Sequence, residues 1–207
     1  NSGEMSRPHA VIIAGGSGRR LGGVRKADLR VGGVRLIERI AMVLDDVAAP
    51  LLVAVGPRGN GLALPKGAIA VLDPPAATGG PLAGLAAAVA ALQARGINDG
   101  ILLSATVDTP FLPADFAPRM VSALEGHDAG FACWGEDFYP PNAVWRIAAL
   151  ADLPQRVLRG DAAPSLKALL AEISACRVDW ASHSPVNPFA NLNTLADLVT
   201  LGQRARR

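Results

Sequence analysis

Uninterrupted apolar runs of strand length, separated by longer segments with helical periodicity, limit the fold of this 207-residue chain more than any other feature. The first four runs do not alternate between polar and apolar residues, which is typical of parallel strands covered by helices on both faces. Strands that alternate with helices predict right-handed β-α-β units. The predicted strands are His9–Ala14, Leu51–Gly56, Ala68–Leu72, Gly100–Ala105, Gly130–Trp134, Ala143–Trp145 and Arg177–Trp180.

Capping residues support the helices predicted between these strands. Pro81 suits the first turn of a helix and Gly96 suits its end. Thr194 followed by Asp197 has the spacing of a weak capping box. The predicted helices are Leu36–Val47, Pro81–Arg95, Ala114–Glu125, Ile147–Leu153, Ala163–Ser174 and Thr194–Arg204. We therefore expect an α/β protein with a three-layer αβα, Rossmann-like fold and a mostly parallel central sheet.

A turn rich in glycine and positive charge follows the first predicted strand. The stretch AGGSGRRLGGVRK, from Ala14 to Lys26, holds five glycines, three arginines and a lysine. Glycines let backbone N–H groups approach a ligand, and the cations add charge, so the turn suits a triphosphate. It is neither a Walker loop, because Ala27 follows Lys26, nor a dinucleotide fingerprint, because its glycine spacing is one residue out. A turn with no ligand is the alternative, but it leaves three cations without a partner.

Composition excludes several classes of function. A net charge of +2 and the lack of a basic stripe with aromatic residues argue against nucleic-acid binding. No apolar run reaches the ~18 residues of a membrane span. The cysteines Cys133 and Cys176 and the three histidines do not have metal-ligand spacing, so we expect no zinc site and a reduced, cytoplasmic location.

Four segments in order resemble the nucleotidyltransferases that activate sugars, phosphates and cofactors with nucleoside triphosphates. The glycine-rich turn is most similar to that of the molybdenum cofactor guanylyltransferase family. The other three segments are LDPPAATGGPLAGL (Leu72 to Leu85), TVDTPFLP (Thr106 to Pro113) and FANLNTLADL (Phe189 to Leu198). The resemblance implies a nucleotidyltransferase fold that covers the chain from His9 onward.

Catalytic roles follow from the resemblance for three residues. It implies that Asp108 binds Mg²⁺ and that Arg20 and Lys26 neutralise charge on the leaving pyrophosphate. Mg²⁺ needs few protein carboxylates, because water and phosphate oxygens complete its ligands. A cap on the turn before Pro110 is the alternative role for Asp108, and Arg19 and Arg25 remain open between phosphate contact and solvated surface.

The resemblance also implies the residues that bind the nucleotide and the acceptor. Asp73 contacts the guanosine part, through base or ribose, unless it is only a loop residue before Pro74. Asn191 and Asn193 lie on the acceptor side, unless they cap the following helix. The full set of implied binding residues is Ile13, Ala14, Gly15, Gly16, Lys26, Asp73, Gly80, Asp108, Asn191 and Asn193.

The implied reaction transfers GMP from GTP to the terminal phosphate of molybdopterin, or of its molybdate-loaded form, with Mg²⁺ as cofactor and pyrophosphate as product. Proteins that deliver or receive the molybdenum cofactor are the implied protein partners. Two alternatives stay open. One is a cytidylyltransferase acting on molybdopterin or a sugar-like phosphate, and the other is a non-catalytic nucleotide-binding regulator on the same fold. Tyr139–Asn142 departs from the His-Pro-Thr common in the family, which leaves the identity of the acceptor least defined.

One domain is expected for residues 9–207, with a nucleotide-binding half at about 9–128 and an acceptor-binding half at about 129–207. A chain in which half of the residues are hydrophobic can form one core of this size. Residues 1–8 are expected to be a disordered remnant of expression and to take no part in the fold.

Overall fold

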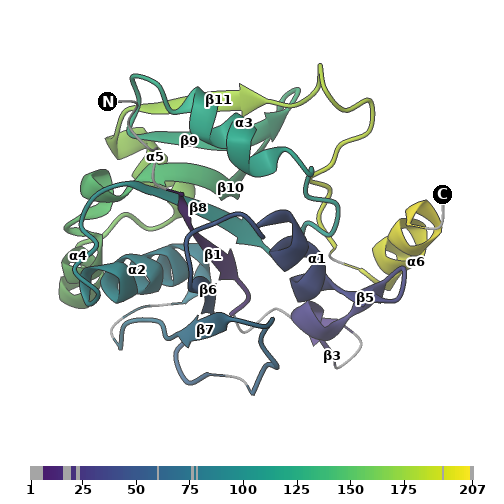
Figure 1. Cartoon of the computed structure of the whole chain (residues 1–207), viewed down its shortest axis with the longest axis horizontal. Coiled ribbons are helices and arrows are strands. Elements are labelled where there is room, and N and C mark those ends of the chain that lie inside the picture. The colour runs from purple at the N-terminus through teal and green to yellow at the C-terminus, as the bar shows by residue number, and fades with distance from the viewer. Residues whose placement is uncertain are drawn as a thin grey trace.

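A seven-stranded sheet forms the centre of the protein in the computed structural model (Figure 1), which describes residues 7–15, 20–21, 24–59, 61–75, 77, 79–192 and 194–205. The strand order is β11-β9-β10-β8-β1-β6-β7. All neighbouring pairs are parallel except those of β10, which is antiparallel to β8 and β9. The strands are β1 His9–Ile13, β6 Leu51–Ala54, β7 Ala68–Val71, β8 Ile101–Thr106, β9 Ala129–Trp134, β10 Asp137–Arg146 and β11 Ala175–Asp179. The predicted α/β class with a mostly parallel sheet is confirmed.

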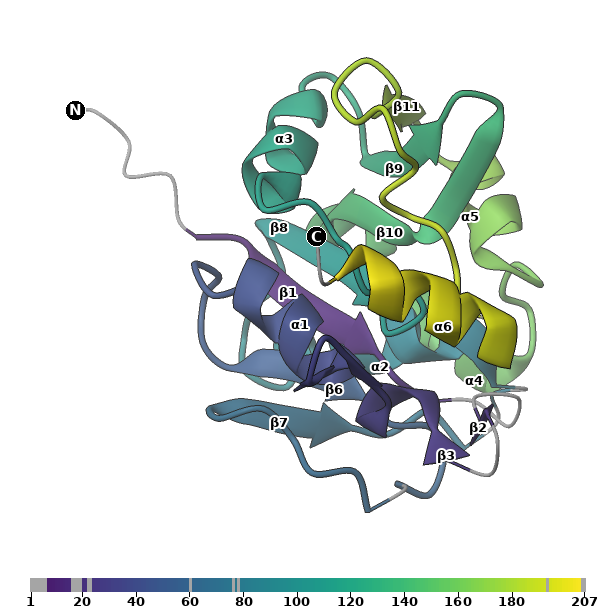
Figure 2. The same cartoon turned by 90° about the vertical axis from the view of Figure 1, so that its right-hand side faces the viewer.

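Helices cover both faces of the sheet (Figure 2). On one face, α1 (Leu36–Val43) and α3 (Phe116–Ala123) contribute to a core cluster with β1 and β8. On the other face, α2 (Gly80–Gln93), α4 (Leu153–Arg159) and α5 (Leu166–Glu172) contribute to a second cluster. Because the central strands are buried on both faces, their sequences are apolar without alternation.

The segment after β1 contains small elements that the apolar pattern did not predict. Two short hairpins, β2–β3 (Arg20–Leu21 with Val24–Arg25) and β4–β5 (Arg30–Val31 with Val34–Arg35), flank a 3₁₀ turn at Lys26–Asp28. Strands of two residues are too short to give a hydrophobic period, so they escape pattern analysis.

The prediction for β10 was too short, and prolines explain the difference. The expected strand Ala143–Trp145 is part of the ten-residue strand β10. Pro140 and Pro141 cannot donate to a ladder, and the pairing with β9 shifts register between Tyr139 and Ala143, where both prolines lie.

Several helix predictions were also wrong in their bounds, and α1 ends at Val43 rather than at Val47. The segment Ile147–Leu153 forms a 3₁₀ helix at Ile147–Leu150, and the separate helix α4 begins at Leu153 with Pro154 in its first turn. Helix α5 begins at Leu166 because the side chain of Ser165 accepts a hydrogen bond from the N–H of Ala168 at 3.1 Å.

The C-terminal helix α6 (Leu195–Arg204) returns to the segment that follows β1 (Figure 2). Its predicted capping box is confirmed, since the Thr194 N–H donates to the Asp197 carboxylate at 2.7 Å and the Asp197 N–H donates to Thr194 Oγ1 at 3.1 Å. Leu192 is buried with Val31 and Leu36 in a small third cluster. Leu192 and α6 therefore pack against the β4–β5 hairpin and the first residue of α1.

Residues Arg7 and Pro8 also contact the folded chain. The Arg7 Nε lies 3.2 Å from Asp46 Oδ1, and the Pro8 carbonyl accepts a hydrogen bond from the Ala48 N–H at 2.8 Å. The other residues of the expected N-terminal remnant, 1–6, lie outside the described residues. Across the described part of the chain, no helix combines the length and apolar character needed to cross a membrane.

We predict that Ser104→Ala lowers the free energy of unfolding by about 1–3 kcal/mol, because it leaves a buried donor without its acceptor. The indole Nε1 of Trp145 donates to Ser104 Oγ at 3.0 Å, and both residues are fully buried in the sheet. Urea denaturation measures the effect. Ser182→Ala, at an exposed serine, is the control and should stay within about 0.5 kcal/mol of wild type. Equal effects of the two substitutions would contradict the prediction.

Candidate active site

The carboxyl ends of β1, β6, β7 and β8 meet at one edge of the sheet, where ligands of open α/β folds bind. Beyond the end of β1, the Ala14 N–H donates to the Ala54 carbonyl at 2.9 Å. On the other side of β1, the Val107 N–H donates to the Ile13 carbonyl at 3.4 Å. The predicted residues Ile13 and Ala14 therefore join the turns that follow β6 and β8.

A close backbone contact explains Gly15. A Cβ atom there would lie 2.3 Å from the Gly56 nitrogen and 2.7 Å from the Val55 carbonyl carbon, so no side chain fits. The Gly56 carbonyl in turn accepts a hydrogen bond from the Asp73 N–H at 3.1 Å. These contacts place the backbones of Gly15, Gly56 and Asp73 side by side at the edge of the sheet.

Asp73 is a buried carboxylate, with 7 % of the residue exposed. It borders a pocket of about 460 Å³ whose walls are otherwise apolar, including Pro57, Leu72 and Pro74. Burial raises the pKa of Asp73, because the charged form loses its hydration. Hydrogen bonds from N–H or O–H groups of a ligand would offset the cost of burying the charged carboxylate.

Gly80 begins α2 and has a φ of +84°, which favours glycine. Further along the helix, a Cβ at Gly84 would lie 3.1 Å from the Ala54 Cβ and 3.5 Å from a methyl carbon of Ile13. Helix α2 therefore packs close to β1 and β6, with its N-terminus at the same edge of the sheet as Gly15.

Lys26 and Asp108 form an ion pair in the same region. The Nζ of Lys26 lies 3.3 Å from Asp108 Oδ1, and the two side chains are 8 % and 19 % exposed. Lys26 belongs to the 3₁₀ turn after β3, and Asp108 lies in the turn that follows β8. The sheet thus brings together two charges that the sequence predicted separately.

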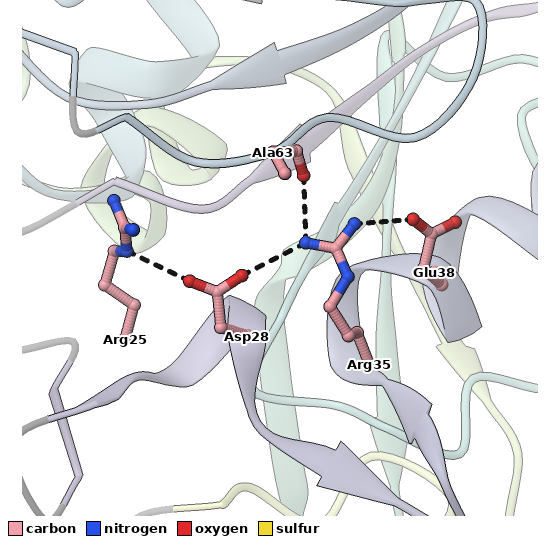
Figure 3. Close-up of polar contacts among 5 residues, drawn as sticks. All are labelled: Arg25, Asp28, Arg35, Glu38 and Ala63. Atoms are coloured by element: carbon pink, nitrogen blue, oxygen red, sulfur yellow. Dashed lines mark hydrogen bonds and ion pairs between the residues drawn. The ribbon is translucent and has the colours of Figure 1, made fainter.

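A network of ion pairs fixes the 3₁₀ turn that carries Lys26 (Figure 3). The carboxylate of Asp28 accepts from Arg25 Nε at 3.1 Å and from Arg35 Nη1 at 3.0 Å. Arg35 also donates to the Glu38 carboxylate at 2.6 Å and to the Ala63 carbonyl at 3.0 Å. Arg35 therefore connects the Lys26 turn with α1 and with the segment between β6 and β7, and Arg25 is engaged with Asp28.

The C-terminal segment reaches the same place through its backbone. The Leu192 N–H donates to the Asp108 carbonyl at 3.0 Å, and the Leu192 side chain is fully buried. This contact places Asn191, the residue before Leu192, next to the Asp108 turn. Gly16 and Asn193 lie outside the described residues, and for Arg20 only the backbone, in β2, is described.

The donor set suits a hard divalent cation bound together with phosphate. Within the described ranges, no group of three or more His, Cys, Asp or Glu side chains could hold a metal by itself. Asp108 offers a carboxylate that is largely shielded from solvent. Mg²⁺ is commonly bound by one or two carboxylates together with phosphate oxygens and water, so this single carboxylate fits the ion.

The sequence analysis missed several polar residues that support the site. Asp28 and Arg35 stand among ordinary surface charges in the sequence, so nothing marks their pairing. Thr106, Thr109 and Asn142 are all buried next to Asp108. The sequence analysis noted Asn142 only within the altered segment Tyr139–Asn142, and its place directly before the apolar run Ala143–Trp145 was a further signal.

Comparison with known proteins identifies the relatives of this chain. The model of a family described as the MobA-like NTP transferase domain matches residues 10–178. A molybdenum cofactor guanylyltransferase of Rhodobacter capsulatus is 36 % identical over 199 residues, which cover 95 % of this chain and 96 % of that protein. A protein of the same name from Acidiphilium cryptum is 39 % identical over 195 residues, which cover 93 % of each chain.

Solved structures share the fold at lower identity. Molybdopterin-guanine dinucleotide biosynthesis protein A from Archaeoglobus fulgidus has a TM-score of 0.74 and 19 % identity, with 96 % of this chain and 98 % of that chain covered. The 2-C-methyl-D-erythritol 4-phosphate cytidylyltransferase from Thermus thermophilus has a TM-score of 0.67 and 20 % identity, with 97 % and 100 % covered. Their likeness concerns the architecture alone.

We predict that Gly15→Ala destabilises the protein by about 1–3 kcal/mol, the usual range for overpacking, because the added Cβ meets backbone rather than a flexible side chain. Gly202→Ala in α6 is the matched control. No atom lies within 4 Å of its added Cβ, so the alanine should stabilise the helix by up to about 1 kcal/mol. Thermal denaturation distinguishes the two, and an unchanged melting temperature for Gly15→Ala would contradict the close contact.

We predict that Asp73→Asn gains stability relative to wild type as the pH rises. Since the folded pKa of Asp73 lies above its ordinary value of 3.8, protonation favours the folded state. Wild type therefore loses stability between pH 3.8 and the raised pKa, and the asparagine variant lacks this loss. Urea denaturation of both proteins at about pH 3 and pH 7 isolates the effect. A stability difference that does not change with pH would contradict the burial cost.

Proposed function

Because this chain belongs to the MobA-like NTP transferase family, we propose that it transfers the guanylyl group of GTP to the terminal phosphate of the molybdenum cofactor. The chain is a nucleotidyltransferase, as its family match and its relatives at 36 % and 39 % identity indicate. The names of these relatives support guanylyl transfer. The observation that carries the proposal is the Lys26–Asp108 pair at the carboxyl edge of the sheet.

We assign the nucleotide to the edge formed by the turns after β1, β6 and β7. Ile13, Ala14 and Gly15 offer backbone at the end of β1, and we assign the same role to Gly16, the next residue in the sequence. Asp73 accepts hydrogen bonds from the guanosine part, which would offset the burial that raises its pKa. Gly80 starts a 14-residue helix whose N-terminal dipole favours an anion nearby.

The acceptor approaches from the C-terminal half, at about residues 129–207, and the nucleotide-binding half spans about 9–128. Asn191, placed beside the Asp108 turn by Leu192, and Asn193 offer amide donors and acceptors to the pterin or its phosphate. Tyr139 lies in the segment Tyr139–Asn142, which departs from the His-Pro-Thr common in the family. Its hydroxyl accepts a hydrogen bond from Asn187 at 2.6 Å, and its ring packs on Phe189.

In the proposed reaction, an oxygen of the acceptor phosphate forms a bond to the α-phosphorus of GTP, the bond from that phosphorus to the bridging oxygen breaks, and pyrophosphate leaves. Lys26 and Arg20 stabilise the negative charge that grows on the pyrophosphate. A phosphate monoester is already anionic at neutral pH, so the chain needs no general base. Asp108 would hold Mg²⁺, which neutralises phosphate charge when it is bound.

The ion pair also explains how these charges are stabilised before substrate binds. An isolated charge of either sign is costly in a site with this little solvent, and the pairing of Lys26 with Asp108 offsets that cost. A magnesium-nucleotide complex supplies each group with a new partner of opposite charge. Substrate binding can then separate the pair without leaving either charge alone.

We predict pyrophosphate release with GTP and molybdopterin together, and with neither alone. Each of the four nucleoside triphosphates is tested with a coupled pyrophosphate assay at a fixed Mg²⁺ concentration. Turnover with CTP in place of GTP would identify a cytidylyltransferase. No turnover with any triphosphate, despite nucleotide binding, would favour a non-catalytic regulator.

We predict that Asp108→Ala abolishes metal-dependent turnover and that Lys26→Met lowers kcat by about 10²–10³-fold, the cost of one transition-state donor. Lys66→Met, at an exposed lysine in the segment between β6 and β7, is the control and should leave kcat unchanged. Circular dichroism verifies that each variant is folded. Near-normal kcat in folded Asp108→Ala would refute the metal assignment.

A further inference from the structure

The side chain of Asn142 reaches the end of β8, where the strand becomes the turn that carries Asp108. Resting on the proposed function, we propose that Asn142 is a positioning residue: it fixes the turn Thr106–Thr109 and so sets the place of the Asp108 carboxylate. Asn142 belongs to β10 and only 1 % of it is exposed. Its amide oxygen forms hydrogen bonds with Thr106 and Thr109, the residues on either side of the turn. It acts through the two threonines.

The amide oxygen of Asn142 takes the place of a backbone acceptor. The ladder between β10 and β8 begins at Ala143, which pairs with Ser104, so Asn142 lies just beyond the regular pairing. Its Oδ1 accepts a hydrogen bond from the Thr106 N–H at 3.2 Å. The side chain thereby extends the connection between the strands to the last residue of β8.

A second contact closes the turn around Asp108. The hydroxyl of Thr109 lies 2.9 Å from the Thr106 carbonyl and 3.3 Å from Asn142 Oδ1, so its proton is shared between two acceptors. The Asp108 N–H donates to Thr106 Oγ1 at 3.4 Å. Both residues that flank the turn are thus held by one buried amide, and Asp108 projects from between them.

The orientation of that amide is fixed by its partner. Because the backbone N–H of Thr106 can only donate, the oxygen of Asn142 and not its nitrogen must face it. The Nδ2 of Asn142 is then buried with no hydrogen-bond partner among the residues that the structure describes. An apolar side chain would avoid the free-energy cost of burying this unpaired N–H group. The hydrogen bonds of the amide oxygen with the turn therefore explain why the residue is an asparagine.

The break in the β10 ladder is what makes the contact available. Pro140 and Pro141 interrupt the pairing with β9, and the register shifts before Ala143. The backbone at Asn142 is thereby released from regular pairing on that side, and its side chain reaches the neighbouring strand β8. This irregularity, which made the predicted strand too short, also brings the Asn142 amide to the turn that carries Asp108.

The experiment measures how strongly Mg²⁺ enhances GTP binding, by calorimetric titration of GTP with Mg²⁺ and with excess chelator. Asn142→Leu should reduce this enhancement by about 10-fold or more, because a lost supporting contact typically costs 10–100-fold in metal affinity. Thr109→Val, which removes only the shared hydroxyl, should reduce it by about 3-fold. The double variant should lose no more than Asn142→Leu alone, because both substitutions break one network.

Val144→Ala is the matched control, since Val144 is equally buried in β10 but pairs with Leu103 inside the β8 ladder, three residues before Thr106. It should lower the melting temperature and leave the Mg²⁺ enhancement unchanged. An enhancement within about 2-fold of wild type in folded Asn142→Leu, or additive losses in the double variant, would overturn the positioning role. Should Asn142→Leu fail to fold, an unchanged enhancement in Thr109→Val would overturn it.

Failure of the proposed function gives a different result. Wild type that binds GTP more tightly with Mg²⁺, yet transfers no guanylyl group to molybdopterin, would refute the proposed reaction while the effect of Asn142 persists. If the GTP affinity of wild type does not respond to Mg²⁺, the positioning role is overturned, because Asp108 then binds no metal for which its position matters.

Discussion

The ion pair between Lys26 and Asp108 is the contact on which the site depends. It joins the segment after β1 to the end of β8, and the two strands are neighbours in the middle of the sheet. In the proposed function the lysine meets phosphate and the carboxylate meets the metal, so the two side chains must lie within a few ångströms of each other. The same proximity lets the two charges neutralise each other when no ligand is bound. This pairing offsets the free energy that is lost when each charge is shielded from water.

Segments far apart in the sequence support each member of the pair. On the lysine side, Asp28 and Arg35 tie the 3₁₀ turn to α1 and to Ala63 in the segment between β6 and β7 (Figure 3). On the aspartate side, Leu192 from the C-terminal segment holds the backbone of the turn. Asn142 holds the residues that flank Asp108. The positions of the two charges are therefore set by backbone and buried polar contacts rather than by flexible surface side chains.

The sequence predicted the part of this arrangement that depends on apolar pattern and local chemistry. The central strands, the place of Pro81 in the first turn of α2 and the capping box at Thr194 all follow from short-range rules, and the structure has them. The meeting of Lys26 with Asp108 requires strand order, which pattern alone does not give. The roles of Arg35 and Asn142 depend on partners distant in the sequence, and the extent of β10 was hidden by its two prolines.

A crystal structure of the complex with Mg²⁺ and a non-hydrolysable GTP analogue tests the central claim most directly. The account predicts a metal ion at about 2.0–2.1 Å from an Asp108 carboxylate oxygen, with phosphate oxygens completing its ligands. It also predicts that the Nζ of Lys26 leaves Asp108 for a phosphate of the nucleotide. A nucleotide bound away from the carboxyl ends of β1 and β8, with the Lys26–Asp108 pair intact and no metal at the carboxylate, would contradict it.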